Sequence, residues 1–82
     1  MRRRVLIANA DPAERARLKT SVRADGHRIC AYAGDARDAV DRAVRTEPDI
    51  CVVAAALPGG GARAAVSIAA QLPNAGVVVL AA

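Results

Sequence analysis

The stretch that decides the fold is residues 5–14, which read VLIANADPAE. Its first four residues form a short, continuous apolar run, which is typical of a strand buried on both faces. The polar residues after this run look like a helix start. Asp11 can cap the helix, Pro12 fits the first helical position, and Glu14 completes a capping-box pattern. The stretch therefore predicts a buried strand that leads directly into a capped helix.

Three helices are predicted from caps, breakers and apolar spacing. The first should end at Gly26, and the second should start from a cap at Asp35 and end before Pro48. The third is closed by Pro73-Asn74, and each helix has one apolar face that we expect to pack on the core. These faces comprise Ala16, Leu18 and Val22 in the first helix, Ala39, Val40, Ala43 and Val44 in the second, and Ala64, Ala65, Ile68, Ala69 and Leu72 in the third.

The remaining strands are apolar almost throughout. They are predicted over residues 27–33, 50–56 and 76–80, and the last is expected to be buried like the first. Within the first of these strands, Ile29 and Ala31 should share one face. The order β-α-β-α-β-α-β, with short connections, predicts an α/β fold with a parallel sheet covered on both faces. Right-handed crossovers favour the doubly wound arrangement.

Length and composition allow one small domain. The chain has 82 residues and 54% hydrophobic residues, which excludes a disordered tail. Ala supplies 21 residues and Tyr32 is the only aromatic residue, so the core must come mainly from Val, Leu and Ile. No apolar run reaches the roughly 20 residues that span a bilayer, and the apolar stretch near the amino terminus is too short for a signal peptide. We therefore expect a cytoplasmic protein without membrane contact.

The basic residues are expected to be solvated rather than functional. The net charge is +4, and eleven of the twelve basic residues are Arg, spread along the chain. Nucleic-acid binding would require these cations on one face, or aromatic residues for stacking. We therefore predict no direct nucleic-acid contact.

The two cysteines, Cys30 and Cys51, match no metal spacing and fall on two strands that should flank the first one. Two strand spacings put them roughly 9–10 Å apart, which is beyond the reach of a disulfide. We expect buried thiols that act as small hydrophobes, with no metal and no cofactor.

Four segments together resemble the receiver domain of response regulators, and among these they are most similar to the NarL type. These are the opening strand with its polar turn, Pro48-Asp49 before the third strand, Leu57-Pro58-Gly59-Gly60 after it, and Pro73 followed by the last strand and Ala81-Ala82. The resemblance implies a flavodoxin-like fold with strand order 2-1-3-4-5. It also implies a phosphorylation site in which acidic residues hold Mg²⁺ and an aspartate accepts the phosphoryl group.

The positions that match this site carry none of the required groups. The two metal-binding acids match Asn9 and Ala10, the phosphoacceptor matches Ala54, and the hydroxyl residue after the fourth strand matches Ala81. Asp11 is the only nearby carboxylate, and its favoured role is the helix cap. The loop beside the site consists of Leu57, Pro58 and Gly59. The resemblance therefore implies a degenerate receiver that holds no metal and forms no aspartyl phosphate.

The resemblance also implies that residues 1–82 are an incomplete receiver-like domain, truncated after the fourth strand. That strand would then lie at a sheet edge. Its segment Val77–Leu80 is Val-rich and uncharged, which favours association through the edge.

The predicted function is that of a phosphorylation-incompetent receiver in a bacterial response regulator. It would regulate transcription through a protein partner or self-association, and it would not be an enzyme. One alternative is a small nucleotide- or phosphate-binding fragment that uses the Gly59-Gly60-Gly61 loop at a helix start, although a flexible turn is by far the favoured explanation of these glycines. Another alternative is an oligomerisation module.

Overall fold

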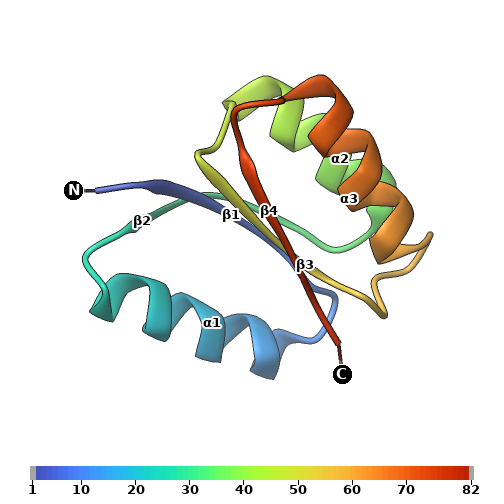
Figure 1. Ribbon diagram of the computed structural model, residues 1–82. Helices are drawn as coiled ribbons and strands as arrows, with labels where there is room; N and C mark the ends of the chain where they lie inside the picture. The colour runs from blue at the N-terminus through green and yellow to red at the C-terminus, as the bar shows by residue number, and fades with distance from the viewer. Residues whose placement is uncertain (1, 82) are drawn as a thin grey trace.

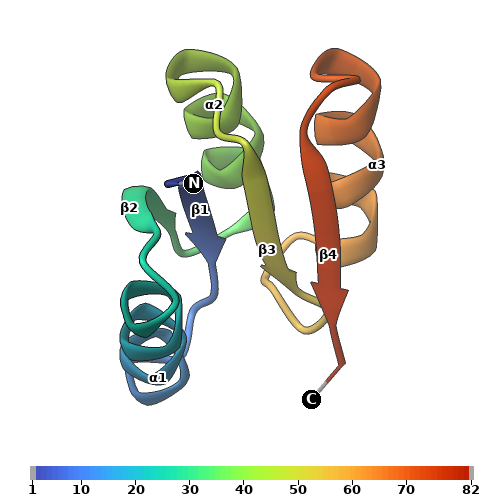
Figure 2. The ribbon, with the colours of Figure 1, turned by 60° about the vertical axis from the view of Figure 1, so that its left-hand side comes forward.

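The computed structural model describes residues 2–81 and contains four parallel strands and three helices. The elements are β1 (Arg4–Ala8), α1 (Pro12–Ala24), β2 (Arg28–Ala33), α2 (Ala36–Thr46), β3 (Ile50–Ala54), α3 (Gly61–Gln71) and β4 (Gly76–Leu80). The strand order is β2-β1-β3-β4, so the predicted parallel sheet and its order are confirmed. Figures 1 and 2 show α1 on one face of this sheet and α2 with α3 on the other.

The core is built around β1, which lies between two other strands. Val5, Leu6 and Ile7 are completely or almost completely buried, as the continuous apolar run predicts. The main cluster lies between the sheet and the α2–α3 layer, where small alanines let the helices approach the strands closely. It contains Leu6, Ala8, Ala33, Ala39, Ala43, Cys51, Val53, Leu57 and Ile68.

The two predicted aspartate caps are present. Asp11 Oδ1 accepts a hydrogen bond from the Ala13 amide at 3.0 Å, and Asp35 Oδ1 accepts one from the Asp38 amide at 2.7 Å. The capping box, however, is not closed. Glu14 forms an ion pair with Arg17 one turn along α1 instead of reaching back to the cap. The Glu14 carboxylate therefore pairs with the Arg17 side chain three residues along the helix and not with the cap.

The fourth strand is not buried, contrary to the prediction from its apolar sequence. Val78, Val79 and Leu80 are 46%, 43% and 37% exposed, because β4 has a neighbour on only one side. Its place at the edge, implied by the receiver order, is confirmed. Two predicted core alanines are also wrong, since Ala16 of α1 and Ala69 of α3 are exposed.

Two elements end two residues before their predicted ends. α1 ends at Ala24, two residues before Gly26, whose φ of +85° carries the chain out of the helix. β3 ends at Ala54, because the next two alanines form a turn rather than a strand.

The register of β2 shifts by one residue against β1. Val5 pairs with Ile29, but Leu6 pairs with Ala31, so Cys30 is the extra residue of a bulge. Cys30 and Ala31 therefore both contact the core, and the predicted alternation stops at this point. Both cysteines are free thiols; Cys51 is buried as predicted, whereas Cys30 is only half-buried.

Among residues 2–81, no helix is both long enough and apolar enough to cross a bilayer.

Candidate functional site

The residues that match the receiver site meet at the carboxyl end of the sheet. Asn9 directly follows β1, Ala54 ends β3, and these two strands are neighbours with Ala8 paired to Val53. Leu80, the register partner of Ala54, precedes Ala81 at the same edge. The parallel order therefore brings together positions that are more than forty residues apart in the sequence.

Asn9 is the buried polar residue of this edge, with 8% exposure. Its backbone amide donates to the Ala33 carbonyl at 2.9 Å, and its side-chain Oδ1 accepts from the backbone amide of Asp11 at 2.9 Å. The Arg15 guanidinium donates to its backbone carbonyl at 3.4 Å. The carboxamide oxygen thus closes a local turn, as asparagine often does. It holds the β1–α1 loop in shape.

The carboxylate closest in sequence to this edge is also engaged. Asp11 accepts from the Ala13 amide at the start of α1, and Ala10 beside it adds only an exposed methyl group. Within residues 2–81, no cluster of three His, Cys, Asp or Glu side chains could hold a metal ion. A divalent cation prefers six or more oxygen ligands, which this edge does not gather from its side chains.

Ala54 lies at the end of β3, between the ends of β1 and β4. Its methyl group is half-buried, and the next amide, that of Ala55, donates to the Leu80 carbonyl at 2.8 Å. A methyl carbon has no lone pair, so it cannot attack a phosphoryl donor. The Ala54 side chain therefore supplies no nucleophile at this edge.

The loop of Leu57, Pro58 and Gly59 fastens β3 to the start of α2. Leu57 is buried, and the Pro58 carbonyl accepts from the Ala36 amide at 2.8 Å. Gly59 has a φ of +89°, and a Cβ there would lie 3.0 Å from the Ala36 Cβ. The loop therefore needs glycine for its path beside α2.

The other two glycines also follow from the path of the chain. Gly60 has a φ of +100°, and its amide is already bonded to the Leu57 carbonyl at 2.9 Å. At Gly61, an added Cβ would lie 2.0 Å from the carbonyl oxygen of Ala54. The start of α3 packs directly on the end of β3, which explains the glycines without a phosphate.

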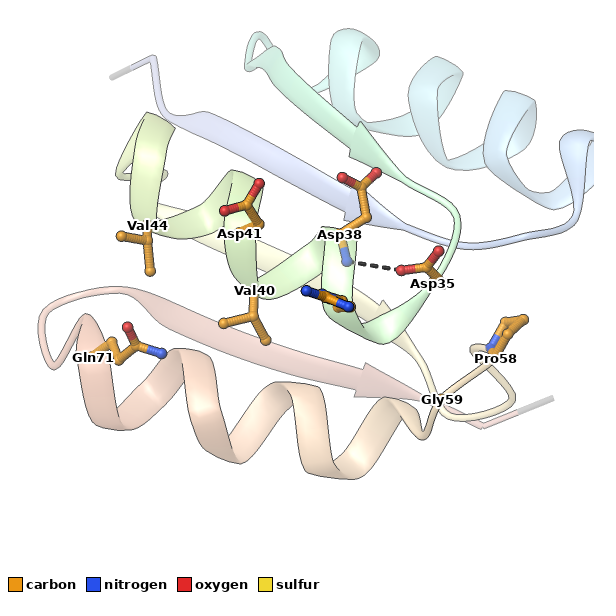
Figure 3. A pocket seen from close by; sticks show the side chains of 9 residues that line it. Asp35, Asp38, Val40, Asp41, Val44, Pro58, Gly59 and Gln71 are labelled. Atoms are coloured by element: carbon orange, nitrogen blue, oxygen red, sulfur yellow. Dashed lines mark hydrogen bonds between the residues drawn. The ribbon is translucent and has the colours of Figure 1, made fainter.

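A surface groove between α2 and α3 was missed by the sequence reasoning. It has a volume of about 880 Å³, and Figure 3 shows Val40 and Val44 of α2 pointing toward α3. The sequence placed both valines in the core, but Val44 is 44% exposed because Ala39 and Ala43 take the buried face. The lining residues are Asp35, Arg37, Asp38, Val40, Asp41, Val44, Pro58, Gly59 and Gln71.

The carboxylates of this groove are largely satisfied within α2. Asp35 caps the helix, Asp38 pairs with Arg42 at 2.9 Å, and Asp41 lies 3.5 Å from Arg45. The groove is therefore a shallow, nearly neutral surface with an apolar floor, suited to contact rather than to catalysis.

The Cys51 thiol has a perturbed pKa. Burial, and to a smaller extent the neighbouring Cys30 thiol, raises the pKa of Cys51 from 9.0 to about 11. The folded protein thus holds this proton more tightly than the unfolded chain does.

The raised pKa predicts a loss of stability at alkaline pH. The contribution of the neutral Cys51 thiol is complete below pH 9 and should decline as the pH rises from 9 toward 11. Urea unfolding measured at several pH values checks this, with Cys51→Ala as the control because it removes only the contribution of this thiol. The prediction fails if both proteins lose stability in parallel.

Comparisons with known proteins agree with this geometry. No family model matches the chain, and no curated protein does. Among solved structures, a LuxR-family two-component response regulator from Aurantimonas sp. SI85-9A1 is similar with a TM-score of 0.89 and 28% identity over 99% of this chain. The receiver (REC) domain of the PhyR response regulator from Erythrobacter litoralis is similar with a TM-score of 0.85 and 29% identity over 98% of this chain. The chain spans 59% and 63% of these two proteins.

A third similar structure contains a protein complex. It is the anti-anti-sigma factor PhyR bound to the anti-sigma factor NepR, from Bartonella quintana. Its TM-score is 0.81 and its identity is 21%, over 96% of this chain and 32% of that one.

Proposed function

We propose that this chain, whose fold is that of a response-regulator receiver domain, is a pseudo-receiver that does not accept a phosphoryl group. Residues 1–82 would form an incomplete receiver unit of a bacterial response regulator in the cytoplasm. The unit would regulate transcription through protein contacts, without direct nucleic-acid contact and without an enzymatic reaction of its own. The observation that carries this proposal is the methyl group of Ala54 at the end of β3, the position that the resemblance assigns to the phosphoacceptor.

The surroundings of Ala54 support the same conclusion. A receiver needs paired carboxylates beside the phosphoacceptor to hold Mg²⁺. The metal ion neutralises negative charge on the phosphoryl group as it transfers. Here Asn9 directs its oxygen to the Asp11 amide and Ala10 has no ligand atom. Ala81, at the position of the hydroxyl residue, could not donate to a phosphate. In the part of the chain that the structure describes, no cluster of His, Cys, Asp or Glu side chains takes the place of these groups.

Protein contact has a structural basis at the β4 edge. The Gly76 amide donates to the Asp49 carbonyl and the Leu80 carbonyl accepts from Ala55, so the even-numbered residues of β4 bond toward β3. Alternate residues of a strand point their amides and carbonyls in opposite directions. Val77 and Val79 therefore present theirs outward. The edge has no charged residue, proline or bulge over 76–80, and such edges pair with other strands.

We assign this edge to contact with a second copy of the chain or a protein partner. PhyR, which contains a similar fold, is found in a complex with another protein. A second copy suits the edge because an uncharged strand of five residues is not repelled by its own sequence in the antiparallel direction.

The test of the missing phosphorylation chemistry is a thermal melt with and without Mg²⁺ and beryllofluoride, which imitates an aspartyl phosphate. We expect no change in Tm, because a ligand stabilises a protein only if the folded state binds it. Adding a nucleotide or inorganic phosphate should have no effect either. A matched control is the triple variant Asn9→Asp/Ala10→Asp/Ala54→Asp, which restores the carboxylates and should gain a Mg²⁺-dependent shift.

Two results would contradict the proposal. A Mg²⁺-dependent rise in the Tm of the wild-type chain would mean that an acidic pocket remains. A saturable rise with nucleotide or phosphate would favour ligand binding at the Gly59-Gly60-Gly61 loop.

A further inference from the structure

The basic residues are concentrated in one part of the molecule. Residues 1–28 contain eight of the twelve Lys and Arg residues but only three of the eight Asp and Glu residues. This part forms β1, α1 and the start of β2. Figures 1 and 2 show α1 standing apart from the other two helices, across the sheet. Most of the positive charge therefore lies in the first third of the chain, and part of it lies on α1.

Three of these cations form a basic stripe, which we define as Arg15, Lys19 and Arg23. They follow one another at intervals of four residues along α1, so they lie on one side of the helix. The ion pairs within residues 2–81 involve Arg17, Arg42 and Arg45, and none involves the basic stripe. Its charge is thus available to an outside partner.

A hollow adjoins the stripe at the open edge of β2. It has a volume of about 470 Å³ and is lined by Pro12, Arg15, Ala16, Lys19 and Tyr32. The Arg15 guanidinium lies over the Tyr32 ring, 5.9 Å from its centroid, which holds both side chains in place. The hollow combines an apolar floor with two cations at its rim.

We propose that the basic stripe and this hollow dock a short acidic segment of a partner protein. One apolar side chain of the segment enters the hollow, and its carboxylates face Arg15, Lys19 and Arg23. The thirteen residues of α1 span about 20 Å, which an extended segment covers with about six residues. Cations that form no ion pair within the described residues pair well with such carboxylates, and the hollow supplies specificity.

The ends of α1 favour a peptide over a nucleic acid. Asp11 caps the first turn, Glu14 lies within it, and Asp25 follows the last turn. These carboxylates would repel a polymer with a phosphate at every step. A peptide can place small or apolar residues opposite them. The inference does not depend on the proposed function, since it uses neither the receiver site nor the β4 edge.

The test is fluorescence anisotropy of a labelled peptide of about eight residues, in which Glu alternates with Leu, added to the 82-residue chain. We expect saturable binding that weakens with salt. The variant Lys19→Gln/Arg23→Gln should weaken binding roughly tenfold. The control Arg37→Gln/Arg63→Gln removes the same charge from the α2–α3 side and should change binding less than about twofold. Circular dichroism checks that each variant is folded.

Several results would overturn this inference. Equal losses in both double variants would mean non-specific attraction to net charge. Equal binding of a peptide with Ser in place of Leu would remove the role of the hollow. Tighter binding of a labelled oligothymidine than of the peptide would assign the basic stripe to nucleic acid instead. An anisotropy that rises linearly with protein concentration, without saturation, would mean that the peptide has no specific site.

Discussion

The substitution Gly61→Ala should strongly lower the free energy of unfolding of this domain. A Cβ at this position would lie 2.0 Å from the Ala54 carbonyl oxygen, 2.9 Å from its carbon and 3.0 Å from the Ala55 Cα. All three are backbone atoms, so relief requires α3 to move away from the end of β3. Overpacking of this severity costs about 3 kcal/mol or more. A domain of this size has only about 4–12 kcal/mol in total.

The matched control is Gly34→Ala, because a Cβ there would have no atom within 4 Å. It should leave the free energy of unfolding unchanged or raise it by up to about 1 kcal/mol, since alanine restricts the unfolded chain. Urea unfolding followed by circular dichroism compares the two. Equal stability of Gly61→Ala and Gly34→Ala would show that α3 does not pack on β3 as closely as described.

The substitution Val79→Pro should convert the assembled chain into a monomer. The Val79 amide points away from β3, so proline there removes an outward donor without breaking a bond of the sheet. The ring also obstructs an approaching strand. We therefore expect the wild-type chain to show an oligomeric mass by light scattering, and Val79→Pro to show a monomeric mass with an unchanged circular dichroism spectrum.

Val79→Ala separates the backbone effect from the loss of the side chain. It removes the branched side chain but keeps the amide, so the oligomeric mass should persist. A monomeric wild-type chain would rule out association through the edge. Monomeric masses for both variants would show that side-chain contact, not strand pairing, holds the copies together.

The element order and the pairing of the central strands could be predicted because their signals are local. The run Val5–Ala8 carries the apolar pattern of a central strand, and the structure buries all of it. Asp11 and Asp35 are caps by residue type and position, and both form the expected bonds. The structure brings Asn9, Ala54 and Ala81 to one edge because the parallel order fixes where strand ends meet, and their match to the receiver site stays a prediction.

Other features depend on neighbours that the sequence does not specify. Val78 and Leu80 are exposed although their sequence suits a buried strand, because exposure depends on what lies beside β4. The Asn9 oxygen could have faced a ligand or its own loop, and only the backbone path decides this. Likewise, three consecutive glycines do not reveal that Gly61 is the one in closest contact.

The position of β1 determines when this domain can fold during its synthesis. The first strand made is an inner strand of the sheet, paired with β2 on one side and β3 on the other. At about 5–20 residues per second, β3 is completed about 2–9 s after β1. Throughout that interval the apolar segment Val5–Ala8 lacks its neighbour on the β3 side. A ribosome-bound chaperone would therefore meet Val5–Ala8 as an incompletely paired apolar segment during this interval.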